Sequence, residues 1–280
     1  MLTLYHHGSS VCAAKVRMVL AEKTLEWHGV YIDILKGDQF SPEYMKLNPK
    51  AVVPTLVHDG KVVLESTVMG EYLDEVFPEP PLKPSDPIGR AEMRLWTKSV
   101  DEHLHPACGE ITFAACHRHI IGRLPPNKLA EFLDSTPPIS VTASWHARKK
   151  EIVREGLKAP GVDATFRLYD RYLQKMDDVL CERHWLAGDE FSLADIGLTP
   201  YVNRLDMLGM SEMWTRDRPR LTDWFERDKQ RPSFQPSFLD MCPADLTADL
   251  KTFGRQSWPE VERLLTAQVG PGGRVEPLTR

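Results

Sequence analysis

The chain has 280 residues, a formal net charge of -5 and a hydrophobic content of 42%, values of a folded protein with one large or two modest domains. This charge, without a dense basic stripe, argues against a nucleic-acid partner. There is no apolar stretch of roughly 20 residues for a membrane span and no signal-peptide pattern at the start. Five cysteines without a C-x-x-C pair argue against a disulfide framework, so we expect a reducing, cytoplasmic location.

The first eighty residues alternate strand and helix patterns. Apolar residues alternate with polar ones at 30–34, and Asp-Gly at 59–60 between two apolar runs is typical of a β-hairpin. The predicted elements are strand 2–6, helix 10–23, strand 30–34, helix 41–47, strands 55–57 and 61–64, and helix 66–77. This order predicts an α/β domain over residues 1–78.

Five prolines in FPEPPLKPSDP predict a linker at 79–87. The next apolar residues recur at helical spacing, so an all-helical domain is expected at 88–242. Within it, Ser192 and Asp195 have the spacing of a capping box, and two Pro-Pro pairs at 125–126 and 137–138 bound an insertion expected to be irregular. Residues 243–280 are polar and predict a C-terminal extension with one short helix near 258–265 and a mobile end.

The segment HHGSSVC brings serine and cysteine to the start of the first helix. Ser10 can cap this helix, and from the same position its hydroxyl could donate to a ligand thiolate that the helix dipole stabilises. Cys12 could be an acidified nucleophile at a helix N-terminus. However, it shares the apolar face of Val16, Val19 and Leu20, and there cysteine serves as a small hydrophobe. We favour the packing role for Cys12.

Two features after residue 47 could bind an extended ligand. If Pro54 is cis, the backbone N–H and C=O of Val53 are free to pair with a peptide-like ligand. A trans proline that opens an edge strand is the alternative. Glu65 and Ser66 precede a helix, and Ser66 suits an N-cap. Free N–H groups at that helix start could also bind a ligand carboxylate, although capping alone explains the pair.

The histidines predict no metal centre. His103 and His105 are two residues apart, as are His117 and His119, so neither pair faces one way on a helix. Asp101 and His105 are four apart and could share a face, where a pocket wall or a solvated surface is expected. Motifs of nucleotide-binding loops, serine hydrolases and zinc proteases do not occur in the sequence.

These segments together, in this order, resemble the glutathione S-transferase superfamily. The resemblance rests on the Ser/Cys turn before KVRMVLAEK, on GDQFSPEYMKLNPKAVVPTL, on DGKVVLESTVMGEYLDEVFP and on WLAGDEFSLADIGLTP, and it covers about residues 1–230. It implies a thioredoxin-like N-terminal domain that binds glutathione, an all-helical C-terminal domain and a homodimer.

The resemblance also assigns the glutathione-binding positions. Val53 would pair through its backbone with the cysteinyl part of glutathione, next to Pro54, which is cis in the family. Glu65 and Ser66 would hold the γ-glutamyl end. Gln39 lies in a stretch that often reaches the glycyl end.

Ser10 falls on the catalytic serine of theta-like and many bacterial members, a position that omega-like members fill with cysteine. Two departures from the family pattern stand out. Val11 replaces the proline that often follows the catalytic residue. Val52 replaces a Lys or Gln, so one glycyl-end contact is missing. Cys12 lies two positions beyond the expected nucleophile, which disfavours a cysteine-type enzyme.

Within the superfamily, AEMRLWTKSVDEHL and the insertion at 125–160 resemble the bacterial lignin β-etherases. Those enzymes use glutathione to displace a phenol from the β-carbon of an aryl ether ketone, and backbone N–H groups are candidates for activating the thiol. The resemblance implies an aromatic electrophile, and we expect His6, His7, His105 and Phe113 to contribute to its pocket. Two alternatives remain: a Cys12-dependent thiol transferase or reductase, and a non-catalytic glutathione-binding protein.

Overall fold

The N-terminal part of the computed structural model, which describes residues 1–266, is a four-stranded sheet with strand order β2-β1-β3-β4. Strand β1 is parallel to β2 and antiparallel to β3, and β3 and β4 are antiparallel. The elements are β1 (Leu2–His6), α1 (Val11–Glu22), β2 (Trp27–Tyr31), α2 (Pro42–Leu47), β3 (Thr55–His58), β4 (Lys61–Val63) and α3 (Ser66–Val76). This is the predicted thioredoxin-like α/β arrangement.

Local sequence signals explain the turns of this sheet. The β3–β4 hairpin turns at Asp59 and Gly60, whose φ angles of 47° and 79° lie in the left-handed region that glycine adopts freely and aspartate tolerates. The second strand was predicted too far along the chain, because β2 ends at Tyr31. The Asp33 carboxylate accepts hydrogen bonds from the backbone N–H groups two and three residues later, and this turn ends the strand.

The C-terminal part is all-helical, as predicted. Two of its segments, 100–104 and 113–117, are π-helical and continue the helices on either side. The helices are α4 (Pro87–Ser99), α5 (His105–Thr112), α6 (Arg118–Ile121), α7 (Pro126–Asp134), α8 (Trp145–Glu155), α9 (Val162–Val179), α10 (Leu193–Met207), α11 (Glu212–Thr215), α12 (Pro219–Lys229) and α13 (Ala244–Thr266).

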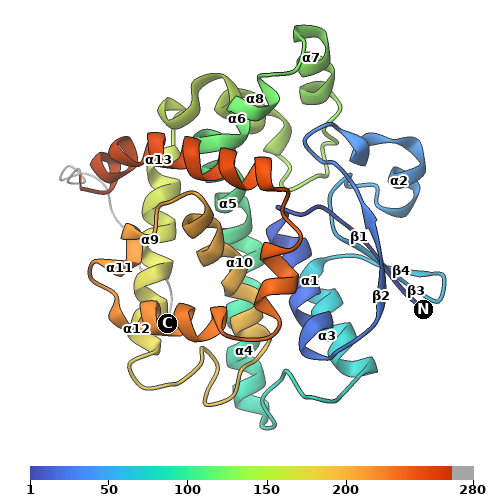
Figure 1. The fold of residues 1–280 in the computed structure, drawn as a ribbon, viewed down its shortest axis with the longest axis vertical. Helices are drawn as coiled ribbons and strands as arrows, with labels where there is room; N and C mark the ends of the chain where they lie inside the picture. The colour runs from blue at the N-terminus through green and yellow to red at the C-terminus, as the bar shows by residue number, and fades with distance from the viewer. Residues whose placement is uncertain (267–280) are drawn as a thin grey trace.

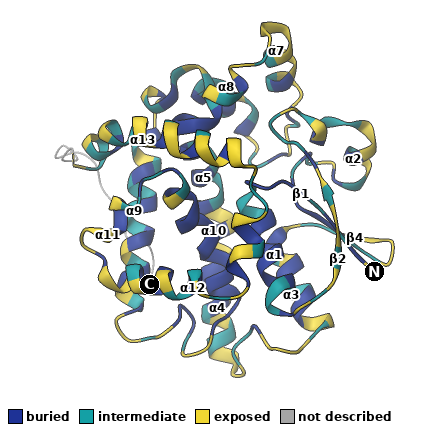
Figure 2. Ribbon diagram, viewed as in Figure 1, coloured by how far each residue is buried: buried dark blue, intermediate teal, exposed yellow. Residues whose placement is uncertain are grey.

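Helix α10 is the centre of the molecule and joins its two parts. It is buried along almost its whole length and packs against α1 and α4 (Figures 1 and 2). Its start is fixed by the predicted capping box, in which Ser192 accepts from the backbone and Asp195 accepts from the backbone N–H of Ser192. The N-terminal and C-terminal parts thus share one continuous hydrophobic core.

Two expectations about the helical part are wrong. The insertion after Pro125 is not irregular, because it contains α7 and α8. The C-terminal extension holds a helix of 23 residues rather than a short one. Leu250 and Val261 of α13 are buried, so packing along this helix extends it beyond what its polar composition suggests. The predicted mobile end lies largely outside the described residues, and among residues 1–266 there is no helix that could cross a membrane.

Candidate active site

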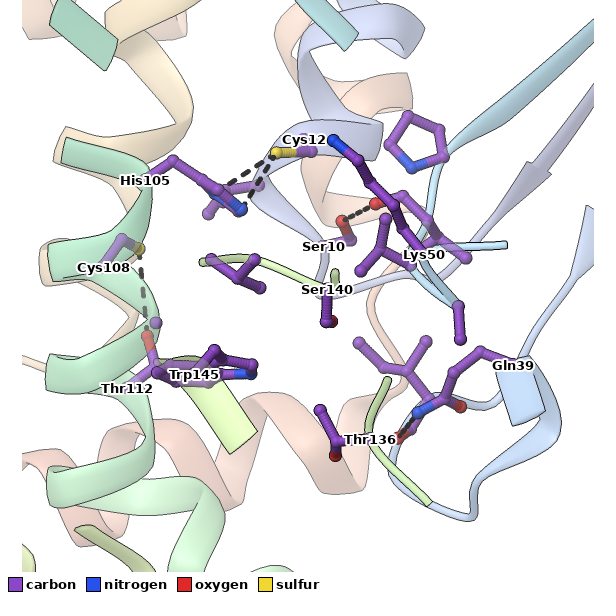
Figure 3. A pocket seen from close by; sticks show the side chains of 18 of the residues that line it. Ser10, Cys12, Gln39, Lys50, His105, Cys108, Thr112, Thr136, Ser140 and Trp145 are labelled. Atoms are coloured by element: carbon purple, nitrogen blue, oxygen red, sulfur yellow. Dashed lines mark hydrogen bonds between the residues drawn. The ribbon is translucent and has the colours of Figure 1, made fainter. Parts of the chain in front are cut away.

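A cavity of about 380 Å³ lies between the N-terminal domain and the helices that face it. One wall is formed by the start of α1 and by the loops that precede α2, β3 and α3. The other wall comes from α5, the π-helical segment after it, and the insertion (Figure 3). The predicted catalytic and glutathione-binding residues all line this cavity: Ser10, Gln39, Val53, Pro54, Glu65 and Ser66.

Ser10 is the N-cap of α1, as predicted. Its Oγ accepts a hydrogen bond from the Ala13 amide (3.2 Å) and donates a long one to the Val53 carbonyl oxygen (3.5 Å). The first intrahelical bond runs from Ala14 N to Ser10 O (2.9 Å), so the amide of Val11 has no partner within the helix. The start of α1 thus presents a hydroxyl and the positive end of the helix dipole to the cavity.

Guanidinium groups hold the loop before Ser10 by its carbonyl oxygens. Arg17 donates to the carbonyl oxygens of His7 (3.2 Å) and Gly8 (3.1 Å), and Arg204 donates to that of Ser9. Both arginines are buried. The carbonyl oxygens of this loop are therefore bonded to two buried cations.

The peptide bond before Pro54 is cis, which confirms what the resemblance implied. Tyr44 Oη and Asn48 Nδ2 both donate to the carbonyl oxygen of Val52, at 2.7 and 3.0 Å, and anchor the loop on its far side. Val53 lies next to the cavity, where its backbone could pair with an extended ligand.

The structure corrects the predicted cap of α3. Ser66 is the first helical residue, and Glu65 occupies the N-cap position with a φ of 67° and without a side-chain cap bond. The Glu65 carboxylate pairs instead with Lys50 (2.7 Å), and both side chains are partly exposed. Glu65 can therefore accept a hydrogen bond from a ligand amine, while the N-terminal amides of α3 can bind a ligand carboxylate.

Gln39 lies at another end of the cavity, in a 3-10 turn (Asp38–Phe40), and is buried. Its Nε2 donates to the carbonyl oxygen of Ile34 (3.2 Å), and its Oε1 has no hydrogen-bond partner among the described residues. An amide with free hydrogen-bonding capacity at this place suits a polar group of a ligand.

Cys12 does not pack as predicted. Its Sγ points toward His105 of α5, with a distance of 3.3 Å to Nδ1 (Figure 3), and lies 3.7 Å from Tyr201 Oη. Val16 and Val19 are fully buried on the helix face that Cys12 was expected to share, whereas Cys12 itself lines the cavity. The partner is 93 residues away in the chain, so no local pattern could reveal it.

The surroundings of Cys12 favour its thiolate. Burial alone raises the pKa of this thiol, but attraction to His105 and Lys15, with hydrogen bonds from His105 and Ser66, lowers it from 9.0 to about 6. Burial lowers the pKa of His105, and the charge of the Cys12 thiolate outweighs this and raises it. Both directions favour a Cys12 thiolate beside a His105 imidazolium.

The second-substrate wall agrees with the sequence only in part. His105 and Phe113 line the cavity, but His6 and His7 do not. Both N-terminal histidines are buried behind the loop, where burial lowers their pKa values to about 4. Sequence reasoning missed several lining residues of the helical part: Cys108, Thr112, His117, Phe132, Trp145, Lys149 and Arg204.

Comparison with known proteins agrees with this geometry. Residues 9–76 match the model of the glutathione S-transferase N-terminal domain, and residues 145–227 match that of the C-terminal domain. The chain belongs to the glutathione S-transferase family. It is a glutathione transferase by this membership, and glutathione is its co-substrate, as the sequence predicted.

Two of the relatives come from Sphingobium bacteria. Protein LigF of Sphingobium sp. strain SYK-6 is 34% identical over 251 residues, which are 88% of this chain and 96% of the relative. The tetrachloro-p-hydroquinone reductive dehalogenase of Sphingobium chlorophenolicum is 28% identical over 84% of this chain and 94% of its own. The crystal structure of β-etherase LigF superposes with a TM-score of 0.77 at 33% identity, over 85% of this chain and 99% of that chain.

Among residues 1–266 there is no cluster of three or more metal-binding side chains. His103 lies near Tyr172, with ring centroids 6.2 Å apart, whereas His105 lies at Cys12. The two histidines therefore point to different neighbours, as their spacing predicted.

Proposed function

We propose that the protein binds glutathione along Gln39, Val53, Pro54, Glu65 and Ser66, and ionises its thiol at the start of α1. The thiolate then attacks an aromatic electrophile in the apolar half of the cavity. One observation carries this proposal: a single cavity joins the Ser10 hydroxyl and the N-terminus of α1 to the backbone of the loop before β3, at Val53, and to an apolar helical wall.

The energetics of thiol activation are within reach of these groups. Lowering the pKa of a thiol from about 9 to about 6.5 requires roughly 3 kcal/mol. A hydrogen bond from Ser10 to the charged sulfur would supply about 1–2 kcal/mol, and the amides and dipole of α1 would supply the rest. The Ser10 hydroxyl can turn to the sulfur at little cost, because its bond to the Val53 carbonyl is long (3.5 Å).

The similarity to LigF supports β-aryl ether cleavage as the reaction. The thiolate sulfur would form a bond to the β-carbon, the carbon–oxygen bond would break, and the phenolate would leave with both electrons and take a proton from water. Phe113 and Trp145, whose ring centroids are 5.7 Å apart, provide an apolar wall for the aromatic rings. The predicted homodimer and cytoplasmic location belong to the same proposal.

A substrate panel tests this function. Purified protein is assayed with glutathione and either a β-aryl ether ketone or a chlorinated aromatic compound, with release of phenolate or chloride as the readout. We expect turnover of the ether, and turnover of the chlorinated compound alone would contradict the etherase assignment. A failure to bind glutathione at millimolar concentration would overturn the whole proposal.

The Cys12–His105 contact favours a second function, a glutathione-dependent thiol transferase. The Cys12 thiolate would attack the glutathionyl sulfur of a mixed disulfide, forming a Cys12–glutathione disulfide and releasing the substrate thiolate. A second glutathione would then reduce Cys12 and leave as glutathione disulfide. Cys12→Ala would abolish this activity and Ser10→Ala would not, whereas the β-etherase activity should show the opposite dependence.

A further inference from the structure

We infer that Lys149, on helix α8 of the insertion, binds the glycyl carboxylate of glutathione from the far side of the cavity. This inference rests on the proposed binding of glutathione. Lys149 lines the cavity although only 3% of its surface is exposed. In residues 1–266 it forms no ion pair, while the adjacent Lys150 pairs with Asp134 at 2.5 Å.

The ammonium of Lys149 is buried without a counter-charge. Its hydrogen bond goes to the hydroxyl of Thr136, and its Nζ lies 4.7 Å from the ring centroid of Phe132 and 5.8 Å from that of Phe40. An ammonium has three donors, and one hydroxyl with two aromatic faces compensates only part of its lost hydration. Burial, with a smaller contribution from Lys150, lowers its pKa to about 8. An anionic ligand would remove this penalty.

Lys149 is the cation available at this end of the cavity. The three lysine and arginine side chains among the lining residues are Lys50, Lys149 and Arg204. Lys50 already pairs with Glu65 at the opening before α3. Arg204 donates through Nη2 to the carbonyl oxygen of Ser9, on the loop before α1, and its Nε and Nη1 have no hydrogen-bond partner among the described residues. A ligand carboxylate that avoids both places therefore finds its counter-charge at Lys149.

The shape of glutathione places such a carboxylate here. Glutathione carries an acidic group at each end. If its α-amino and carboxylate groups bind at Glu65 and Ser66, and its centre pairs with Val53, its glycyl end points toward Gln39. Phe40, which lies within 5.8 Å of the Lys149 ammonium, follows Gln39 directly. Figure 3 shows Thr136, the partner of Lys149, at the same end of the cavity as Gln39 and away from Cys12.

This arrangement compensates for a contact to the glycyl end of glutathione that the N-terminal domain lacks. By the family resemblance, Val52 replaces a Lys or Gln that would contact the glycyl end. Lys149 would supply the missing cation from the other domain. Helices α7 and α8 would then belong to the glutathione site as well as to the wall of the second pocket.

A ligand that lacks the glycyl group tests the inference directly. Dissociation constants of glutathione and γ-glutamylcysteine are measured by calorimetry for the wild type, Lys149→Met and Lys149→Arg, with Lys150→Met as the matched control. We expect Lys149→Met to weaken glutathione about ten- to a hundredfold and to leave γ-glutamylcysteine unchanged. Lys149→Arg should retain most of the affinity, and Lys150→Met all of it.

Three results would overturn the inference while leaving the proposed function intact. In the first, the wild type binds glutathione and γ-glutamylcysteine equally. In the second, Lys149→Met weakens both ligands alike. In the third, Lys149→Met leaves the affinity for glutathione unchanged and raises only the KM of the electrophile in a turnover assay, which would assign Lys149 to the second substrate. A wild type that binds neither ligand would refute the proposed function itself. Thermal unfolding of each variant separates these outcomes from misfolding.

Discussion

Replacing His105 by alanine is expected to raise the pKa of Cys12, so that the thiol is no longer ionised at neutral pH. The imidazole lies 3.3 Å from the sulfur through Nδ1, and it is the first favourable influence on the pKa of that thiol. Without it, burial opposes ionisation with only Lys15 and a hydrogen bond from Ser66 to offset it. The pKa of Cys12 should therefore return from about 6 to its ordinary value of 9.0 or above.

The structure sets the size of this effect. At 3.3 Å and an effective dielectric constant of about 20, the attraction between thiolate and imidazolium is about 5 kcal/mol. The lowering of the pKa from 9.0 to about 6 corresponds to about 4 kcal/mol, so the attraction is large enough to cover it and part of the cost of burial. At about pH 7 the thiolate fraction falls from about nine-tenths to about one-hundredth, and alkylation should slow about a hundredfold.

Alkylation by iodoacetamide at a series of pH values measures this change. Peptide mass spectrometry is needed to follow Cys12 alone, because Cys181 is exposed and Cys242 is partly so. His103→Ala is the matched control, since His103 lies near Tyr172 and not at the sulfur. A wild-type rate that rises only above about pH 8, or an unchanged profile in His105→Ala, would refute the pairing.

Two further predictions concern the core that holds the site together. Asp195→Ala should lower the free energy of unfolding, measured by urea denaturation, by about 3 kcal/mol. The reason is that the amide of Ser192 and the indole N–H of Trp224 lose their hydrogen-bond acceptor. A loss below about 1 kcal/mol would contradict this prediction. Burial raises the pKa of the Asp228 carboxyl to about 8 in the folded protein, from 3.8 in the unfolded chain. The protonated carboxyl therefore contributes its full stability below pH 3.8, and this contribution is lost as the pH rises through about 8. Asp228→Asn should therefore be less sensitive to pH between about 5 and 8 than the wild type, and parallel stability curves would refute it.

The hydrogen bonds around Asp228 support its protonation. The Thr199 hydroxyl is bonded both to the carbonyl oxygen of Asp195 (2.8 Å) and to the Asp228 carboxyl. One hydroxyl carries one proton and can donate to only one of them. A protonated Asp228 supplies the second proton, which an asparagine amide would also do.

The parts of the fold that could be predicted are those set by neighbours in the chain. Asp59-Gly60 determines a turn by its backbone preferences, and Ser192 with Asp195 fixes a helix start. Helix α8 could not be predicted in this way. Its buried residues are Trp145, Lys149 and Ile152, at helical spacing, but the lysine in the middle interrupts the apolar stripe.

In the candidate site too, the features set by neighbours in the chain could be predicted and those set by distant residues could not. Ser10 was predicted at the helix start because capping is local, and the structure confirms that cap. The expected packing of Cys12 on the apolar face of α1 is wrong, because its partner His105 comes from a helix of the other domain. His6 and His7 were placed in the second pocket from their position after a strand, but the guanidinium of Arg17 holds their loop with both rings turned inward.

The pKa of the thiol of bound glutathione shows whether the start of α1 ionises it. Thiolate absorbance at about 240 nm is followed by pH titration of the glutathione complex. Cys12→Ala protein is used, so that the protein's own thiolate does not contribute, with Ser10→Ala added in a second variant. We expect a midpoint near 6.5 for bound glutathione and a higher one when Ser10 is also replaced. A midpoint near 9, the value of a free thiol, would contradict this expectation.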